Sequence, residues 1–359
     1  MGNNMSFRND TGTISAIPYA VLVLVIFGLF LVGMGPVIDE IIQVDNQMMG
    51  MATVTTSPPT ATPTPTPRPT ATPTPVPTPE PAPSVVQVSA GYDHSLALLS
   101  NGTVIGWGYD LGGRATPPAT LSDAIAVSAG SDHSLALRSD GTVVGWGFNH
   151  NGQTTPPAWL TDVTAIAAGS RHSLALRSDG TVVGWGYNYD GQATPPAGLS
   201  GVVAIAANGY FSLALLENGT VVAWGNNDYG QRNVPDGLTA TAIAAGQLHS
   251  LAVREDGTVV GWGHNGWGQA PAVYSPPVGL DATALTGASY SSYALLSDGS
   301  VVGWGQGNPG WLTPSAELTD VAQISAGYYH VLALCENGTV VAWGDNDDGE
   351  SDIPPGLGR

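Results

Sequence analysis

A tryptophan recurs through most of the chain at an almost constant interval. It stands at seven positions between residues 107 and 343, and most neighbouring pairs are 39 residues apart. Glycine follows each of these tryptophans directly, and an Asn-Gly or Asp-Gly pair precedes each by six and five residues. Self-similarity with a period of about 40 residues is the signature of a repeat architecture, so we predict seven copies of one structural unit. The seven positions are Trp107, Trp146, Trp185, Trp224, Trp262, Trp304 and Trp343.

Each unit divides into short apolar runs separated by turn residues. In the second copy, the run Ala124–Ala129 is followed by His133–Leu137 and then by Thr142–Trp146. The pair Asp140-Gly141 lies between the last two runs and predicts a type I′ hairpin turn. We predict a fourth, edge strand at Thr154–Pro157, where proline is tolerated because no central ladder needs its amide.

The runs are apolar on both faces, as in Val143-Val144-Gly145-Trp146. A sheet with one solvent-exposed face alternates polar and apolar residues, whereas a strand buried on both faces does not. Four short strands in a unit that packs between two neighbours are typical of a β-propeller, which usually has four to eight blades. We therefore predict an all-β fold in which residues 85–359 form a seven-bladed β-propeller. A β-solenoid is the structural alternative, although its repeats are usually shorter.

The repeat resembles that of a known family. Residues 163–192 read V-T-A-I-A-A-G-S-R-H-S-L-A-L-R-S-D-G-T-V-V-G-W-G-Y-N-Y-D-G-Q, which is similar to the regulator of chromosome condensation repeat. The unit does not resemble a WD repeat, because glycine rather than aspartate follows each tryptophan. The resemblance covers residues 85–359 and is closest to the bacterial branch, which includes the propeller-type β-lactamase inhibitory protein. It implies a seven-bladed propeller, in agreement with the number of units.

The resemblance implies little about function, because one propeller fold serves many roles. The eukaryotic protein that gives the family its name is a guanine-nucleotide exchange factor on chromatin, with basic segments and an inserted wedge. This chain carries a net charge of −19 and nine basic residues, all of them arginine. Nucleic-acid binding relies on clustered Lys and Arg. We therefore expect neither nucleotide exchange nor a nucleic-acid partner.

A long apolar run near the start of the chain predicts a membrane anchor. Ile17–Val32 is almost wholly apolar, and with its uncharged flanks it is long enough to cross a hydrocarbon layer of about 30 Å. Arg8 before the run and acidic residues after it place the propeller outside the cell by the positive-inside rule. A cleaved signal peptide is the alternative, although no small-x-small cleavage site follows the run. The predicted segments are a cytoplasmic N-terminus (1–13), a transmembrane helix (14–38) and a juxtamembrane segment (39–56).

Threonine and proline dominate residues 57–84. Alternating proline fixes φ and removes amide donors, so we predict a disordered, extended linker without helix or sheet. At about 3.1 Å per residue this linker spans roughly 85 Å, and Thr-Pro tracts are also typical of O-glycosylated stalks. The chain is thus predicted to be a single-pass cell-membrane protein whose propeller is extracytoplasmic.

Positions shared by all units are explained by the fold, so function is expected where the units differ. The loops after each Trp-Gly pair carry aromatic residues among polar ones, and a second set follows the Ala-Gly strand ends. Protein interfaces favour aromatic residues with polar neighbours, so we predict that the loops bind a protein or a glycan. The alternative is that these rings only cover the blade ends. The predicted binding residues are Tyr109, Phe148, Tyr187, Tyr189, Tyr229, Trp267 and Trp311, and the second set is Tyr92, Arg171, Tyr210, Phe211, Tyr290, Tyr328 and Tyr329.

Two patterns resemble metal-binding sequences, but we assign no metal to either. Five histidines share one position of the unit, and equivalent positions in separate blades are too far apart to hold one ion at about 2.0–2.1 Å. We interpret these histidines as structural. The acidic stretch 345–352 lacks the spacing of an EF-hand loop, so we interpret it as a solvated rim, with a calcium site as the alternative. The histidines are His94, His133, His172, His249 and His330.

No catalytic motif and no cofactor-binding motif occurs in the sequence. The single cysteine, Cys335, rules out an internal disulfide and is interpreted as a structural thiol. We therefore predict a non-enzymatic binding module without a cofactor. Inhibition of an extracytoplasmic enzyme such as a β-lactamase is one alternative, and a propeller enzyme with a site built from distant loops is another.

Overall fold

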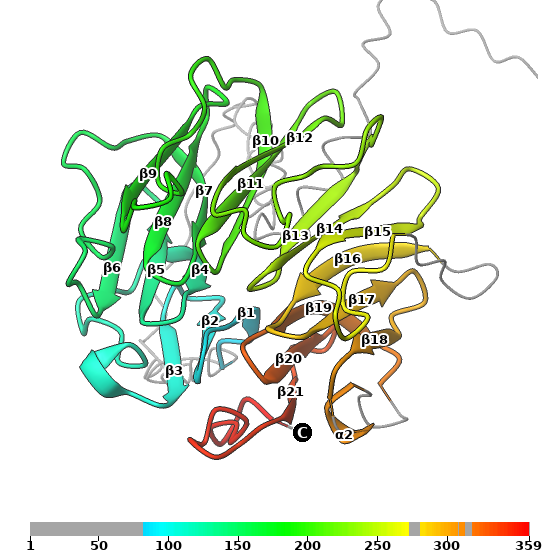
Figure 1. The fold of residues 1–359 in the computed structure, drawn as a ribbon. Helices are drawn as coiled ribbons and strands as arrows, with labels where there is room; N and C mark the ends of the chain where they lie inside the picture. Colours follow the sequence, from blue (N-terminus) through cyan, green and yellow to red (C-terminus); the bar gives the residue numbers. More distant parts are fainter. Residues whose placement is uncertain (1–81, 273–280, 308, 313–317, 359) are drawn as a thin grey trace, which may run out of the picture. The chain divides into compact units, whose positions relative to one another are not determined.

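The computed structural model describes residues 82–272, 281–307, 309–312 and 318–358 (Figure 1). The predicted transmembrane helix, the juxtamembrane segment and the stalk up to residue 81 lie outside these residues. Within the described part of the chain, no helix is long and apolar enough to cross a membrane.

The described residues form 21 strands in seven sheets, each of three antiparallel strands in sequence order. Each sheet corresponds to one repeat, so the all-β class and the seven blades of the propeller are confirmed. Two short helices, η2 (Leu111–Gly113) and α2 (Pro309–Leu312), lie in the loops after blades 1 and 6. The blades are β1 (Val85–Ala90), β2 (His94–Leu99), β3 (Val104–Gly108); β4 (Ala124–Ala129), β5 (His133–Arg138), β6 (Val143–Gly147); β7 (Val163–Ala168), β8 (His172–Arg177), β9 (Val182–Gly186); β10 (Val202–Asn208), β11 (Phe211–Leu216), β12 (Val221–Gly225); β13 (Ala242–Ala245), β14 (His249–Val253), β15 (Val259–Gly263); β16 (Ala282–Gly287), β17 (Ser291–Leu296), β18 (Val301–Gly305); and β19 (Val321–Ala326), β20 (His330–Cys335), β21 (Val340–Gly344).

The blades close into a ring in which blade 7 packs against blade 1 (Figure 1). The first strand of every blade is innermost, because residues of all seven line one central channel of about 180 Å³. At the closure, the Val88 N–H donates to Gln323 Oε1 at 3.0 Å, and the Ala90 N–H donates to Ser325 Oγ at 2.9 Å. Side chains of the neighbouring blade thus accept hydrogen bonds from amides on the inner edge strand. Without them, these amides at the edge of the sheet would have no partner in the blade.

The fourth strand predicted at Thr154–Pro157 is wrong, since every sheet in the described part of the chain has three strands. The segment still lies against the third strand, because a Cβ on Gly145 would approach the Thr154 carbonyl oxygen to 2.6 Å. Pro156 and Pro157 have no amide hydrogen to donate. The segment therefore packs beside the blade without forming a ladder of hydrogen bonds.

The predicted type I′ hairpin turn is also wrong. A type I′ turn needs a positive φ at both central residues, but Asp140 does not have one, and only Gly141 does, with a φ of 78°. The Gly141 N–H donates to the Arg138 carbonyl at 3.0 Å, so glycine ends the turn and forms the bulge of a three-residue loop. The Asp140 carboxylate accepts the Thr142 hydroxyl at 2.6 Å and the Thr142 N–H at 2.9 Å. These two bonds lower the pKa of Asp140.

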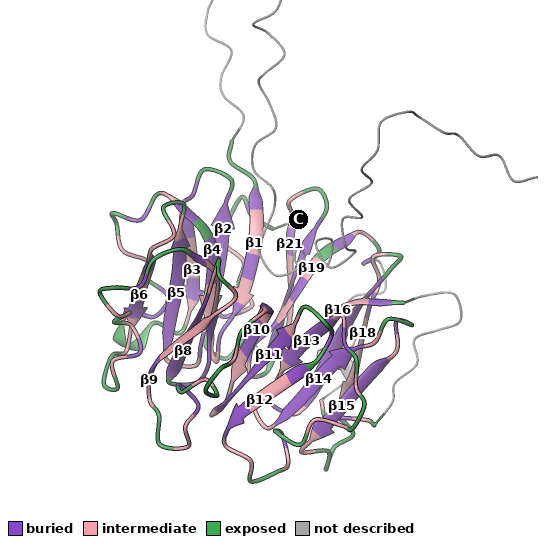
Figure 2. Ribbon diagram, turned by 90° about the horizontal axis from the view of Figure 1, so that it is seen from above, coloured by how far each residue is buried: buried purple, intermediate pink, exposed green. Residues whose placement is uncertain are grey.

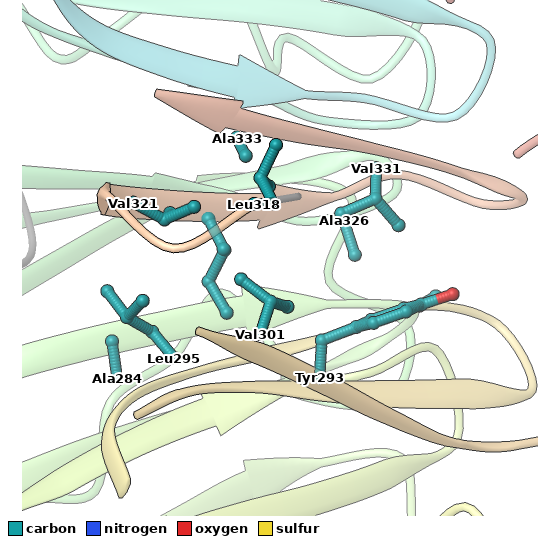
Figure 3. Close-up of a cluster of buried hydrophobic side chains, with 11 residues drawn as sticks. Ala284, Tyr293, Leu295, Val301, Leu318, Val321, Ala326, Val331 and Ala333 are labelled. Carbon is teal, nitrogen blue, oxygen red and sulfur yellow. The ribbon is translucent and has the colours of Figure 1, made fainter. Parts of the chain in front are cut away.

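Apolar side chains of adjacent blades pack face to face, as the two-sided apolar strands predict. Between blades 6 and 7, Tyr293 and Val301 of one blade meet Val321 and Val331 of the next (Figure 3). The middle strand of each blade is the most buried, and the exposed residues gather in the loops at both ends of the ring (Figure 2).

A polar network, which we call the seam network, joins neighbouring blades inside this apolar packing. Between blades 2 and 3, His133 Nε2 lies 2.9 Å from Ser173 Oγ, and that hydroxyl donates to the Gln153 carbonyl at 2.8 Å. Trp185 Nε1 donates to the same carbonyl at 2.8 Å. Because the only hydroxyl proton goes to the carbonyl, the serine accepts from histidine, whose proton is therefore on Nε2. Burial lowers the pKa of His133 to about 3, so the ring is neutral at physiological pH.

The seam network has two departures from this pattern. In blade 4, Phe211 takes the place of histidine and is fully buried, so its assignment to the loop aromatics is wrong. Between blades 6 and 7, Ser291 replaces the histidine and Val331 replaces the serine. There the Tyr293 hydroxyl donates to the Trp311 carbonyl at 2.8 Å and supplies the bond that the serine makes elsewhere.

Candidate functional site

Two kinds of loop form one end of the ring, which we call the loop face. One kind joins the first strand to the second, and the other follows the third strand, so antiparallel pairing brings both to the same end of each blade. Backbone hydrogen bonds connect them: the Tyr109 N–H donates to the Asp93 carbonyl at 2.7 Å, and the Tyr187 N–H donates to the Arg171 carbonyl at 2.8 Å. Both aromatic sets therefore lie on the loop face, apart from the buried Phe211.

Four of the predicted binding residues lie over blades 1 to 3. Tyr109 and Phe148 flank the guanidinium carbon of Arg114, which is 4.9 Å and 5.6 Å from their ring centres. Tyr187 packs against a tyrosine of the next blade at 5.5 Å between ring centres. Tyr189 is 87% exposed. None of these four rings lines the central channel or the hollow described next.

The other three predicted residues, Tyr229, Trp267 and Trp311, line one hollow of the loop face. We call this hollow the aromatic groove; it has a volume of about 820 Å³ and extends over blades 4 to 7. Tyr229 and Trp267 are half exposed, at 50% and 54%. No described residue that lines the groove is Asp, Glu or Arg. Further lining residues are His264, Tyr290, Ser291, Tyr293, Gln306 and Tyr329.

The aromatic groove lies where blade 6 departs from the repeat. Ser291 stands at the position of the larger histidine, and both it and Tyr293 line the groove. Trp311 occupies the position that is glutamine in several other blades, where Gln153, for example, bonds to its own loop through the Asn151 N–H at 3.0 Å. The Trp311 carbonyl still accepts bonds from the seam, while its side chain lines the groove. The sequence changes in blade 6 therefore keep the backbone contacts and alter the surface.

Four tyrosines form what we call the tyrosine cluster, between the aromatic groove and the central channel. The rings of Tyr92 and Tyr328 stack at 3.9 Å between centres, and Tyr329 meets Tyr328 edge-on at 4.4 Å. The fourth member, Tyr290, lies 6.4 Å from Tyr328. Tyr329 is also 5.7 Å from Trp311, which makes the cluster continuous with the groove. Burial, followed by the neighbouring Tyr328, raises the pKa of Tyr329 to about 12, so its hydroxyl is uncharged.

All four members of the tyrosine cluster belong to the second aromatic set and were absent from the predicted binding residues. Their signal in the sequence lies at the two positions before the second strand of the blade. Tyr92 and Tyr328 stand at the first of these, where other blades carry residues such as Ser131, Ser170 and Gln247, and Tyr290 and Tyr329 stand at the second. Sequence reasoning missed them because blade 1 comes beside blade 7, the neighbour of blade 6, only when the ring closes.

Carboxylates lie beside the tyrosine cluster where blade 7 meets blade 1. Burial, followed by the charges of Asp348 and Glu350, raises the pKa of Asp93 to about 6. The Asp345 N–H donates to the Tyr329 carbonyl at 3.0 Å, so this aspartate borders the cluster. Glu350 is only 3% exposed, and burial raises its pKa. No arginine in the described part of the chain forms an ion pair with these four carboxylates.

The loop face carries ion-paired arginine on its other side. Arg114 Nη1 lies 3.6 Å from Asp132, and Arg171 Nε lies 3.3 Å from the same carboxylate group. Blades 1 to 3 thus neutralise this acidic group locally. The two sides of the loop face therefore differ: blades 1 to 3 hold an ion-paired carboxylate, whereas the tyrosine cluster lies beside carboxylates for which the described residues show no ion pair.

The described residues contain no group of three or more His, Cys, Asp or Glu side chains placed to hold a metal ion. In the acidic stretch that suggested calcium, Asn346 Nδ2 donates to Asp352 Oδ1 at 2.8 Å. The Ser351 N–H donates to Asn346 Oδ1 at 2.9 Å. This loop therefore uses several of its oxygens for its own hydrogen bonds.

Comparison with protein families finds one match. The model described as "Regulator of chromosome condensation (RCC1) repeat" matches six segments, which correspond to blades 1 to 5 and blade 7. Blade 6, which forms much of the aromatic groove, is not among these segments. No curated protein matches the chain. The matched segments are 85–113, 124–153, 163–192, 202–231, 240–269 and 321–350.

Several solved structures share the fold. The ectodomain of the Physcomitrella patens receptor kinase CR4 is 24% identical, with 73% of this chain and 74% of that chain covered and a TM-score of 0.59. The ectodomain of the Arabidopsis thaliana receptor kinase ACR4 is 20% identical, with 73% and 98% covered and a TM-score of 0.59. Prp20p from Saccharomyces cerevisiae is 18% identical, with 75% and 84% covered and a TM-score of 0.57. At these identities the likeness shows the fold alone.

Proposed function

The chain belongs to the regulator of chromosome condensation (RCC1) repeat family, and from this premise we propose that it is a binding module that recognises a protein through its loop face. The observation that carries the proposal is the aromatic groove, together with the tyrosine cluster that adjoins it. Exposed Trp and Tyr rings in a surface hollow are the residues and the setting in which binding energy concentrates at protein interfaces. The proposed role is non-enzymatic.

The location of the groove within the repeat supports this proposal. A ring that only has to cover the ends of its blades has no need for one blade that differs from the rest. Blade 6 differs at Ser291, Tyr293 and Trp311, and all three residues line the groove. These three differences of blade 6 thus meet at one surface hollow.

We also propose that the module is displayed outside the cell on a membrane anchor. The apolar run between residues 14 and 38, the flanking charges and the Thr-Pro stretch of residues 57–84 support this placement. Two structural neighbours are ectodomains of receptor kinases, a setting compatible with such display. A spacer of this kind would hold a binding face away from the membrane surface.

The test is capture of surface proteins by the full-length chain and by its Trp267→Ala variant. Loss of a central aromatic side chain typically costs at least about 2 kcal/mol of binding, or roughly thirtyfold in affinity. We expect a partner that the unmodified chain captures to be lost with Trp267→Ala. Tyr189→Ala, on the same face but outside the groove, is the matched control and should retain the partner.

The free energy of unfolding of both variants should lie within about 0.5 kcal/mol of that of the unmodified protein, because the two side chains are 54% and 87% exposed. Equal capture by the unmodified chain and the Trp267→Ala variant would show that the groove is not the binding surface. A strongly destabilised Trp267→Ala protein would instead assign this ring to packing.

A further inference from the structure

We infer that the aromatic groove and the tyrosine cluster accept a basic peptide segment, whose Arg or Lys side chains stack on the aromatic rings. This inference rests on the proposed function and specifies the chemistry of the partner. It is based on the available ring faces, on the distribution of charge around them, and on a contact of the same kind elsewhere on the loop face.

The rings offer faces to a ligand. Tyr229, Trp267 and Tyr329 are 50%, 54% and 38% exposed, and all three line the groove. A guanidinium or ammonium group above such a ring is attracted by the negative face of its π-system, and the attraction grows as water is excluded. The aliphatic stem of the same Arg or Lys side chain packs on the groove lining, which contains no charged Asp, Glu or Arg among its described residues.

The loop face already uses this contact within the chain itself. Arg114 lies with its guanidinium carbon 4.9 Å from the ring centre of Tyr109 and 5.6 Å from that of Phe148. The same arginine has a carboxylate beside it, Asp132, at 3.6 Å. Aromatic rings with a neighbouring carboxylate thus hold a guanidinium on blades 1 to 3. The aromatic groove has rings and adjoins a cluster with nearby carboxylates, but none of the described arginines lines it.

Charge complementarity selects a basic occupant over a neutral or acidic one. Asp93, Asp345 and Asp348 lie together beside the tyrosine cluster where blade 7 meets blade 1, and no described arginine forms an ion pair with them. Burial raises the pKa of Asp93, and repulsion by the neighbouring carboxylates raises it further. A cation bound there would relieve that repulsion, whereas an acidic or phosphorylated partner would add to it. The net charge of −19 also steers basic partners toward the chain.

The experiment measures binding of labelled synthetic peptides to the full-length chain by fluorescence anisotropy. The probe is a Gly-Ser peptide of about ten residues that carries three spaced arginines, and its counterparts carry Gln or Glu at the same places. A neutral oligosaccharide of similar length is the fourth ligand. We expect the arginine peptide to bind at least tenfold more tightly than the Gln peptide, and more weakly as salt rises, because opposite charges attract less when screened.

Two aspartates at the same place of the repeat provide a matched pair of variants. The backbone N–H of Asp348 donates to Glu350, and that of Asp190 donates to Gln192 in the same way. Asp348 interacts electrostatically with Asp93, which follows Tyr92 of the tyrosine cluster, whereas Asp190 belongs to blade 3. Asp348→Asn should weaken binding of the arginine peptide about threefold or more, and Asp190→Asn should leave its affinity unchanged. Trp267→Ala should weaken it about three- to tenfold, the range expected for loss of one cation–aromatic contact.

Four results would overturn the inference. One is equal binding of the Gln and arginine peptides, and another is equal loss in both aspartate variants, which would indicate general attraction to an acidic surface. The third is binding of the neutral oligosaccharide alone, which would make the groove a glycan site. If no peptide binds while Trp267→Ala still loses its captured protein, the basic-peptide inference fails and the proposed function stands. If capture is independent of Trp267, the proposed function fails.

Discussion

The seams between the blades and the loop face above them use the same repeat under opposite constraints. In the seams, one position is histidine in five blades, and each of these histidines is fully buried with its Nε2 about 2.9 Å from a serine of the next blade. On the loop face, the residue directly after each Trp-Gly pair differs in almost every blade. These residues are Tyr109, Phe148, Tyr187, Asn226, His264, Gln306 and Asp345.

The difference follows from what surrounds each position. A seam residue has a hydrogen-bond partner and close-packed neighbours, so a change there leaves either a cavity or a buried polar group without a partner. A loop-face residue has solvent on one side, so substitution costs the fold little. Positions that vary on the loop face are therefore free to carry recognition.

Blade 6 is where both regions change together. The seam between blades 6 and 7 loses its histidine and serine, and Tyr293 restores the bond to the Trp311 carbonyl. The same two residues, Tyr293 and Trp311, line the aromatic groove. A change in the seam, compensated within the chain, thus accompanies the change of the binding surface.

The largest difference in stability between seam and loop face is expected when a cavity is made in a seam. Leu174 in β8 is fully buried, and Leu174→Ala should lower the free energy of unfolding by about 2–5 kcal/mol, as truncation of a buried leucine usually does. Tyr189→Ala on the loop face should change it by less than about 0.5 kcal/mol. Urea unfolding followed by tryptophan fluorescence measures both. Similar losses in the two variants would contradict the contrast between seam and loop face.

A smaller loss of stability is expected when one hydrogen bond of the seam network is removed and the apolar packing is left intact. Ser173→Ala leaves the buried His133 Nε2 proton without an acceptor and should cost about 1–3 kcal/mol of unfolding free energy. Ser250 is the matched control, because Phe211 stands at the histidine position of the preceding blade, and within the described residues the Ser250 hydroxyl bonds to the Gln231 carbonyl alone. Ser250→Ala should cost about 0.5–1.5 kcal/mol, since that carbonyl keeps its bond from Trp262. Equal costs would mean that the histidine bond contributes nothing.

The smallest expected effect is a pH dependence on the loop face. The pKa of Asp93 is about 6 in the folded protein, above its ordinary value of 3.8, because of burial and neighbouring carboxylates. A raised carboxyl pKa means that the folded state binds the proton more tightly, so this contribution to stability is present below about pH 4 and is lost as pH rises through about 6. Asp93→Asn should therefore gain stability relative to the unmodified protein between about pH 4 and 7. Melting temperatures across this range test the prediction, and a constant difference between the two proteins would refute it.

Several features of the fold were predictable from the sequence, because they depend on residues close together in the chain. The Trp-Gly period predicts the number of blades, and the two-sided apolar strands predict that blades pack against one another. The hairpin was misread because Asp-Gly suits more than one turn, and the choice depends on whether Asp140 or only Gly141 takes a positive φ. The edge strand was misread because Pro156 and Pro157 keep the segment beside the blade but remove its donors.

The candidate site was predictable only in part. Tyr229, Trp267 and Trp311 were identified from their loops, but so were Tyr109 and Tyr189, and the sequence contains no signal that separates the two groups. The separation depends on Ser291, which leaves room where other blades place a histidine, and on the contacts between blades 1, 6 and 7 that assemble the tyrosine cluster.

The repeat, its β-structure and the loops in which the blades differ are all encoded locally, because strand periodicity and turn chemistry act over a few neighbouring residues. Which of those loops lie together depends on how the blades assemble. Ring closure brings Tyr92 beside Tyr328, although more than 200 residues of chain separate them, and so joins the cluster, the groove and the acidic rim. Such contacts depend on the angle and order of whole sheets around an axis, which no short stretch of sequence encodes.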